Sequence, residues 1–358
     1  MSEIKRSPLH ELHCDAGGRM VPFAGWEMPV MYDSILNEHR AVREAVGQFD
    51  ISHMGQLFVE GEKAEGWLNS LLTNDVAALV DGQGQYTFLL NERGGVIDDL
   101  ILYRIQEGSY FMVVNAACLT TDLAWFERHK QHGVTLRDAS DSMAGIAVQG
   151  PKAVDVFSRV FGGRTLPARN GIDALTMDGQ NIWVCRTGYT GEDGFEFFCS
   201  SGAAERWWED FAEAGAEPCG LGARDSLRLE KCFPLNGSDL NPERTPLEAG
   251  LGFFVKLGKG DFTGSEVLVA QKENKPAEKL TAILCDQKGA PPRPGYPVLN
   301  TEGKTIGTLT SGVLSPCLSL GIGMAYLPIE AAKEGTEVFI EARGKKMNAK
   351  VVKKPFVA

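Results

Sequence analysis

The chain has 358 residues, a length that suggests at least two domains and allows a large hydrophobic core. Its hydrophobic content of 43% and its charged content of 23% exclude a disordered protein. The formal net charge of −11 argues against non-specific binding to nucleic acid or to an anionic membrane. No apolar run is long enough for a membrane-spanning helix, and residues 1–6 lack the apolar core of a secretory signal.

Eight cysteines are dispersed along the chain, and no two of them form a C-x-x-C pair. In a chain of this size without a signal sequence, this distribution predicts reduced thiols and a cytoplasmic location. Two histidine pairs, His10 with His13 and His129 with His132, have a spacing at which a helix places two metal ligands on one face. Because no third ligand accompanies either pair, we expect surface or structural histidines and no metal.

Helical and strand-like patterns alternate irregularly through the first 270 residues. Helical periodicity marks residues 35–46, 119–129 and 203–214. Gly47 is expected to end the first of these helices. Alternating apolar residues mark strands at 85–90, 96–103 and 109–115. The turn-forming residues at 91–95 predict that the first two of these strands pair as a hairpin.

Short strands separated by glycine and proline dominate the end of the chain. The polar residues 271–276 are the best candidate for a linker. Strand-like segments then follow at 280–284, 304–310, 321–326, 337–342 and 347–352. Their spacing predicts a small closed β-structure, which together with the mixed elements upstream makes the chain an α+β protein. A dinucleotide-binding fold is disfavoured, because no strand is followed by a G-x-G-x-x-G segment.

Residues 94–101, Gly-Gly-Val-Ile-Asp-Asp-Leu-Ile, place two adjacent carboxylates at the start of an apolar strand. Neighbouring side chains of a strand point to opposite faces, so one of Asp98 and Asp99 is expected to point inward. An inward carboxylate needs a cation or hydrogen-bond donors. Spacing alone leaves two interpretations open: a pair of turn-capping aspartates, or a carboxylate held in a pocket for a cationic ligand or intermediate.

Two further segments combine glycines with groups able to bind a ligand. Residues 186–196 contain three glycines, the flat ring of Tyr189, and Glu196 between phenylalanines. They predict either a hairpin with exposed acids or a carboxylate that accepts two N–H bonds from a planar heterocycle. Residues 218–230 predict a glycine turn that enters a helix, on which Arg224 and Arg228 share a face. These arginines either pair with nearby acids or bind an acidic ligand.

Taken together and in this order, the motifs resemble those of the T-protein family of the glycine cleavage system, the aminomethyltransferases. The resemblance extends from about residue 9 to residue 356 and so covers nearly the whole chain. The segments that support it are residues 23–29, 49–55, 94–101, 114–116, 147–151, 187–196, 220–230, 245–251 and 310–316.

The resemblance implies both a reaction and a fold. Family members transfer a carbon from the aminomethylated lipoyl arm of the H-protein to tetrahydrofolate, which yields 5,10-methylenetetrahydrofolate and ammonia. Their fold is a three-subdomain cloverleaf around a central folate channel, and the last subdomain is a small β-barrel. We therefore expect a folate-binding domain over residues 1–270, with subdomains at roughly 1–52 plus 145–270 and at 53–144. The barrel is expected at 277–358.

The resemblance also implies roles for individual residues. Asp99 matches the catalytic carboxylate of the family, Glu196 its pterin-binding glutamate, and Arg224 a folate-binding arginine. Further positions that line or border the folate channel are Tyr86, Asn115, Tyr189 and Met54. The expected co-substrate is tetrahydrofolate and the expected partner is the lipoylated H-protein. Neither a metal nor a nucleic acid or membrane partner is expected.

Other functions remain open at this point. Many family members have an aromatic residue where this chain has Asn236, so no stacking contact is expected there. The main alternative is a folate-binding relative of the iron–sulfur maintenance or RNA-modification branch without transferase activity. Its K-G-C-Y-x-G-Q-E segment is matched here only by residues 231–233, Lys-Cys-Phe. A relative of the sarcosine and dimethylglycine oxidases is disfavoured because the chain has no flavin domain. A binding module with an inactive site is disfavoured by the presence of Asp99, Glu196 and Arg224.

The last residues differ in charge from the rest of the chain. Between residues 340 and 358, six basic residues oppose one acid, which gives a local formal charge of +5. Such a segment is either a solvated edge strand whose lysines prevent association, or a docking surface for the H-protein. The H-proteins of this family tend to be acidic, which favours the second interpretation.

Overall fold

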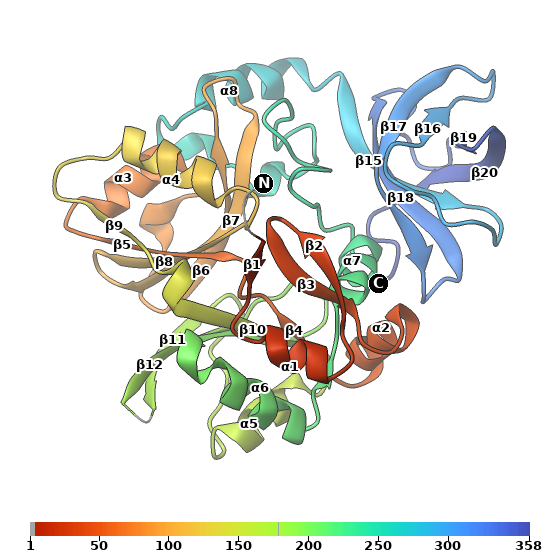
Figure 1. The fold of residues 1–358 in the computed structure, drawn as a ribbon. Helices are drawn as coiled ribbons and strands as arrows, with labels where there is room; N and C mark the ends of the chain where they lie inside the picture. Colours follow the sequence, from red (N-terminus) through yellow and green to blue (C-terminus); the bar gives the residue numbers. More distant parts are fainter. Residues whose placement is uncertain (1–3, 178) are drawn as a thin grey trace. The chain divides into compact units, whose positions relative to one another are not determined.

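The computed structural model describes residues 4–177 and 179–358. The chain divides into two compact units that do not follow a single cut in the sequence. The first unit contains Met1–Asn69, Asp75–Thr87 and Asp99–Asp225, and the second contains Ser70–Asn74, Phe88–Asp98 and Ser226–Ala358. Both helices and strands are present, and the α+β class predicted from the sequence is confirmed (Figure 1).

A six-stranded sheet forms one layer of the first unit. Its order is β11 (Ile172–Met177), β12 (Gln180–Cys185), β13 (Gly194–Ser200), β10 (Met143–Gln149), β4 (Gly47–Asp50) and β14 (Glu217–Pro218). Helices α5 (Ala153–Val160) and α6 (Ala204–Glu213) cover one face with an aromatic core. Within that core the rings of Phe161 and Trp207 stack 5.4 Å apart. Burial of these large side chains is the main stabilising contribution of this layer.

A five-stranded sheet forms the other layer of the first unit, except for residues 88–90 and 96–98 of its first two strands, which belong to the second unit. Its order is β6 (Gln83–Leu90), β7 (Val96–Gln106), β8 (Ser109–Val114), β5 (Gly55–Glu60) and β9 (Thr135–Asp138). The predicted hairpin of the first two strands is confirmed by their adjacency. Phe111 packs edge-on against Phe198 of the six-stranded sheet at 5.2 Å, and Phe58 lies 5.1 Å from Trp183. The two sheets of this unit therefore pack face to face.

Helices and a small sheet complete the first unit. Helices α3 (Ala64–Leu71) and α4 (Leu119–Arg128) contact each other through Trp67 and Phe126, whose rings lie 5.6 Å apart. The small sheet has the order β1 (Lys5–Arg6), β3 (Trp26–Met31) and β2 (Arg19–Phe23). The N-terminal segment also contains α1 (His10–Asp15) and α2 (Ile35–Glu44), and the hydroxyl of Ser34 caps α2 by accepting from the backbone N–H of Asn37.

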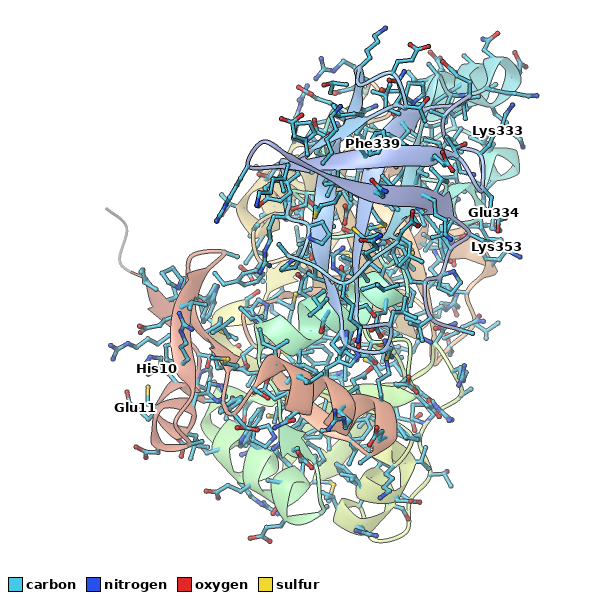
Figure 2. The ribbon with its side chains drawn as sticks, turned by 90° about the vertical axis from the view of Figure 1, so that its right-hand side faces the viewer. His10, Glu11, Lys333, Glu334, Phe339 and Lys353 are labelled. Atoms are coloured by element: carbon cyan, nitrogen blue, oxygen red, sulfur yellow. The ribbon has the colours of Figure 1, made fainter. Side chains whose placement is uncertain are left out.

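Three histidines of the two pairs contact neighbouring protein groups, and the fourth, His132, is exposed. His10 lies on α1 (labelled in Figure 2), and its Nε2 is 2.9 Å from a carboxylate oxygen of Glu27. His13 is fully buried, with Nε2 2.9 Å from Asp50 and Nδ1 2.8 Å from the hydroxyl of Tyr32. At the end of α4, His129 contacts the carbonyl oxygen of Trp125 through Nδ1 at 2.8 Å. These three histidines thus bind neighbouring protein groups.

The second unit contains the predicted barrel. Its closed order is β15 (Glu278–Cys285), β18 (Leu320–Pro328), β17 (Thr305–Ser315), β16 (Pro297–Leu299), β19 (Glu337–Ala342) and β20 (Lys345–Val352). Apolar side chains from all six strands fill its interior. Short strands with polar outer faces and no free edge are typical of a small closed sheet. The repeated pattern of strands and turns in the sequence therefore predicted the barrel.

Three details differ from the sequence prediction. Residues 271–274 are the last turn of α8 (Ser265–Asn274), so the predicted linker begins only after this helix. Gly47 does not cap α2 but begins β4, since the helix already ends at Glu44. The short strand β16 was not predicted, because three residues flanked by turns give no clear alternation.

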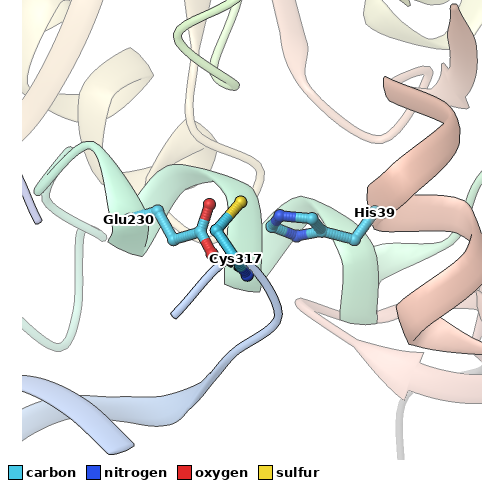
Figure 3. A group of neighbouring side chains, drawn as sticks. All are labelled: His39, Glu230 and Cys317. Carbon is cyan, nitrogen blue, oxygen red and sulfur yellow. Dashed lines mark hydrogen bonds between the residues drawn. The ribbon is translucent and has the colours of Figure 1, made fainter. Parts of the chain in front are cut away.

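A buried ion pair organises the second unit. Arg228, near the end of α7 (Leu221–Glu230), donates to Asp239 at 2.7 Å, and their side chains are 2% and 0% exposed. Arg228 also donates to the hydroxyl of Ser311 on β17 at 2.7 Å, and that hydroxyl donates to Asp239 at 2.8 Å. Beside this pair, Glu230 and Cys317 lie next to each other (Figure 3), and Glu230 accepts from the backbone N–H of Cys317 at 3.1 Å. These bonds attach the end of the helix to the barrel within this unit.

Replacement of Arg228 by Met is expected to destabilise the second unit strongly. The substitution leaves Asp239 buried without its cation, and loss of one partner of a buried pair costs about 3–5 kcal/mol. The free energy of unfolding in urea measures the effect. As a control, Arg206→Met removes an exposed pair with Asp210 at 3.6 Å and should cost less than about 1 kcal/mol. Equal losses in the two variants would contradict the role assigned to the buried pair.

Candidate functional site

Asp99 lies on β7 and is held by residues from the two neighbouring strands. The hydroxyl of Tyr86 on β6 donates to Asp99 Oδ2 at 2.8 Å. Asn115, directly after β8, donates through Nδ2 to Oδ1 at 3.1 Å and to the backbone oxygen of Asp99 at 2.9 Å. All three residues are half-buried, and the bonds to Oδ1 and Oδ2 fix the orientation of the carboxylate. Three residues predicted for the site are thereby in direct contact.

Met54 lies at the same end of this sheet. The antiparallel register of β5 and β8 pairs Gly55 with Val114. Met54 directly precedes β5 in a turn, in which its backbone N–H donates to the carbonyl oxygen of Ile51 at 3.0 Å, and its side chain is half-buried. An apolar, flexible side chain at this end of the sheet is able to contact an organic ligand.

Glu196 is a second carboxylate of the first unit, in a different environment. It lies on β13 between Ala147 of β10 and Cys185 of β12, and it is 7% exposed. Thr187 donates its hydroxyl to Glu196 Oε2 at 2.7 Å. The pKa of this carboxyl group is raised, because the effect of burial exceeds the lowering by the Thr187 hydrogen bond and by the charge of Arg224. The exposed-acid interpretation of residues 186–196 is therefore wrong for Glu196.

Thr187 has a second contact, with Tyr103 of the five-stranded sheet. The hydroxyl of Tyr103 on β7 lies 2.6 Å from Thr187 Oγ1, and Tyr103 is fully buried. Burial and the charge of Glu196 both raise the pKa of the Tyr103 hydroxyl. Sequence reasoning missed this tyrosine, because it lies 84 residues from Thr187 in an apolar strand with no motif of its own.

Arg224, on the first turn of α7, lies near Glu196 and Tyr189. Its guanidinium is 4.9 Å from the centre of the Tyr189 ring, within the range of a cation–π contact. Burial lowers the pKa of the guanidinium, and the charge of Glu196 raises it. Its buried Nη1 has no hydrogen-bond partner among residues 4–177 and 179–358. A buried donor without a partner is rare in folded proteins and indicates a ligand or water at this point.

Glu38 fixes the start of the helix that bears Arg224. The backbone N–H of Gly220 donates to Glu38 Oε2 at 2.8 Å, and the N–H groups of Tyr32 and Asp33 donate to Oε1 at 2.6 and 3.2 Å. A side chain at position 220 would collide with the backbone of Val30, so glycine is required there. The glycine turn predicted from the sequence thus positions Arg224, whereas Glu38 gave no sequence signal.

Asp98 differs from its neighbour Asp99, as strand alternation predicts. It is fully buried in the second unit, where Asn236 donates to its Oδ1 at 3.1 Å. A neutral amide donor thus meets this buried carboxylate at position 236, where the sequence predicts no stacking contact. Asn236 therefore has a hydrogen-bonding role in this chain.

His53 is a buried residue next to Met54. Its side chain is almost completely buried and packs edge-on against Phe23 at 5.5 Å. Within the described part of the chain, Nδ1 has no hydrogen-bond partner. Burial lowers the pKa of the imidazole to about 4, with the charge of Arg224 acting in the same direction and that of Asp50 opposing it. His53 is therefore neutral near pH 7.

The neutral state of His53 predicts a dependence of stability on pH. Because its folded-state pKa lies below the ordinary histidine value, the unfolded chain binds more protons between pH 6.5 and pH 4. Stability is therefore expected to fall as the pH drops through this range, by about 2 kcal/mol at pH 4.5 from this residue alone. In His53→Asn, urea unfolding at pH 7 and pH 4.5 should show a smaller loss. The exposed His132→Asn serves as control, and an unchanged slope in His53→Asn would contradict the prediction.

Two family models match the chain. The one described as "GCVT N-terminal domain" covers residues 9–259, and the one described as "Glycine cleavage T-protein C-terminal barrel domain" covers residues 279–358. None of the helices in the described residues has the length and apolar character needed to cross a membrane.

Similar proteins match along the full length of the chain. An aminomethyltransferase of Symbiobacterium thermophilum is 44% identical over 99% of this chain and 97% of its own. One of Bacillus subtilis is 43% identical over 99% of both chains. The crystal structure of glycine cleavage system aminomethyltransferase T from Bartonella henselae has a TM-score of 0.93 and 37% identity, over 99% of this chain and 98% of that one.

Proposed function

The chain belongs to the glycine cleavage T-protein family, and from this membership we propose that it is the aminomethyltransferase of a glycine cleavage system. The reaction takes the methylene carbon from the aminomethylated dihydrolipoyl arm of the H-protein and transfers it to tetrahydrofolate. The products are 5,10-methylenetetrahydrofolate, ammonia and the dihydrolipoyl H-protein. The observation that supports the proposal best is the grouping of Asp99, Tyr86 and Asn115 at one fixed, half-exposed carboxylate.

Asp99 is proposed as the catalytic carboxylate. Collapse of the N–CH₂–S donor gives a thiolate and a cationic iminium carbon, which a folate nitrogen then attacks. A negative charge next to that carbon stabilises the cation and is able to accept the proton that the attacking amine loses. The bonds from Tyr86 and Asn115 keep the carboxylate in one orientation, which reduces the cost of reorganisation during the reaction.

Glu196 and Arg224 are proposed to bind the pterin ring of tetrahydrofolate. The 2-amino group and the adjacent ring N–H of a pterin form a pair of donors that suits one carboxylate. The unpartnered Nη1 of Arg224 offers a donor to a ring oxygen, and Tyr189 offers a flat face. We propose that Tyr86, Asn115 and Met54 line the same folate site.

The partner is proposed to be the lipoylated H-protein, and no metal is required by this mechanism. A cytoplasmic location is proposed as well. It is supported by the eight cysteines, all of them free thiols, of which six are buried. The division into a folate-binding domain over 1–270 and a barrel domain over 277–358 stays a prediction.

Ammonia release tests the proposed function directly. Aminomethylated H-protein is incubated with the purified chain, with and without tetrahydrofolate, and ammonia and methylenetetrahydrofolate are measured. Production of both, dependent on tetrahydrofolate, is the expected result. Folate binding without any turnover would instead support the non-transferase relatives.

Asp99→Asn is expected to lower the rate of transfer by about 10²–10³ while folate binding stays nearly unchanged, because a neutral amide does not balance the cationic intermediate. Single-turnover kinetics with saturating H-protein measure the rate. Asp141→Asn is the matched control, since Asp141 is an exposed carboxylate of the same unit that pairs with Lys5. A rate for Asp99→Asn within a few-fold of the unmodified chain would exclude the catalytic assignment.

Glu196→Gln is expected to weaken binding of tetrahydrofolate more than it slows the chemical step. The amide introduces donors that face the donors of the pterin, and such a loss costs about 2–5 kcal/mol. Quenching of tryptophan fluorescence during titration with tetrahydrofolate gives the affinity. Unchanged affinity would place Glu196 outside the pterin site.

The basic C-terminal segment is proposed as the docking surface for an acidic H-protein. Arg343, Lys345, Lys346, Lys350 and Lys353 are exposed on and after the β19–β20 hairpin, whereas Lys354 is half-buried. Figure 2 labels Phe339 on β19, and the ammonium of Lys346 lies 5.6 Å from its ring. This surface is cationic on a chain of net charge −11, so it would attract a partner that the rest of the chain repels.

Charge reversal tests this docking surface. In Lys345→Glu/Lys346→Glu the KM for H-protein is expected to rise about tenfold at low salt, with little change in kcat. In the unmodified chain the same KM should rise with salt concentration. The control is the double variant Lys63→Glu/Lys152→Glu, which changes the net charge by the same amount at two other exposed lysines. A KM that responds to neither salt nor the hairpin substitutions would leave these lysines without a docking role.

A further inference from the structure

A chain of hydrogen bonds leads from the interior of the first unit to Glu196. Thr187 has one hydroxyl proton, and that proton is donated to Glu196 Oε2 at 2.7 Å. The contact of 2.6 Å between Thr187 Oγ1 and the Tyr103 hydroxyl must then use the proton of Tyr103. With Glu196 ionised, the direction of the chain is therefore Tyr103 to Thr187 and Thr187 to Glu196.

The surroundings of Glu196 make this direction important. The carboxylate is 7% exposed and lies in a strand between phenylalanines, so its charged form loses most of its hydration. The titratable or charged groups that act on it are Tyr103 on β7, Cys185 on β12 and Arg224 on α7. Tyr103 and Cys185 are neutral, because burial raises the pKa of both well above neutrality. Arg224 is the cation among these groups.

We propose that Tyr103 and Thr187 are positioning residues that hold the buried Glu196 as an ionised acceptor, so that the site selects ligands presenting N–H donors. The proposal rests on the folate-binding role proposed above for Glu196. Two successive hydroxyl donors polarise each other, which strengthens the bond to the charged carboxylate. The Thr187 hydroxyl occupies Oε2 from the protein side and so orients the carboxylate plane, and Tyr103 holds Thr187 in place. A neutral Glu196 would present a proton of its own and would clash with a pterin donor.

Substitutions that remove the hydroxyl group of Tyr103 or Thr187 test the proposal while the carboxylate of Glu196 stays in place. The dissociation constant of tetrahydrofolate is measured between pH 5 and pH 8 for the unmodified chain, Tyr103→Phe, Thr187→Val and Thr187→Ser. In every case binding weakens as the pH falls and Glu196 takes up a proton. Thr187→Val is expected to move this loss upward by about one pH unit, because a bond to the charged form is lost. Tyr103→Phe is expected to move the pH of this loss by less. Thr187→Ser keeps a hydroxyl group and is expected to show the profile of the unmodified chain.

Matched variants separate this effect from a general loss of structure. Tyr110→Phe removes the hydroxyl of another buried tyrosine, 3.5 Å from a carboxylate oxygen of Glu65, and should leave the profile unchanged. Thr176→Val removes a hydroxyl at the surface and should do the same. A uniform weakening at all pH values in Thr187→Val would show a merely structural role and overturn the proposal.

Glu196→Gln distinguishes failure of this proposal from failure of the proposed function. This variant has no titrating carboxyl group, so its folate affinity is expected to be weak and without the acidic loss. If Glu196→Gln loses affinity while the profile of Thr187→Val stays in place, the folate site stands and the positioning pair is wrong. If Glu196→Gln binds tetrahydrofolate as tightly as the unmodified chain, the role of Glu196 in the proposed function is wrong.

Discussion

The burial of a negative charge in the first unit is the constraint on which its site depends. Glu196 lies almost out of contact with water, and an isolated carboxylate there would be strongly unfavourable. The fold compensates with a hydroxyl from Thr187 and a guanidinium from α7. Both depend on the backbone around them: the face-to-face sheets bring Tyr103 to Thr187, and Glu38 fixes the turn before Arg224.

Two carboxylates of one unit have acquired different properties from their environments. Asp99 is half-buried and receives bonds from a phenol and an amide, which fix its orientation. Glu196 is buried and is influenced by a cation. An oriented carboxylate that remains accessible suits a transient positive charge, whereas a buried one suits the fixed donors of a bound heterocycle. The difference follows from burial and neighbours, since the two side chains have the same functional group.

The resemblance to a known family assigned Asp99, Tyr86 and Asn115 to the site, and Glu196 and Arg224 with them. The turn residues at 91–95 independently predicted the hairpin whose two strands carry Tyr86 and Asp99. Tyr103 and Glu38 could not be predicted, because each acts on a residue far along the chain and lies in an ordinary apolar or amphipathic pattern. The barrel was predictable from repeated short strands, but the end of α8 was not, since its polar last turn is similar in composition to a linker.

The division between the two units falls within several elements, among them the strands β6 (Gln83–Leu90) and β7 (Val96–Gln106), each of which belongs partly to one unit and partly to the other. The backbone N–H of Val96 donates to the carbonyl oxygens of Asn241 and Arg244, and Asn91 donates to that of Pro242. A fragment truncated after Asp225 would keep the whole six-stranded sheet but would lose every one of these acceptors. The units are therefore not modules that gene fusion or fission could exchange at one junction.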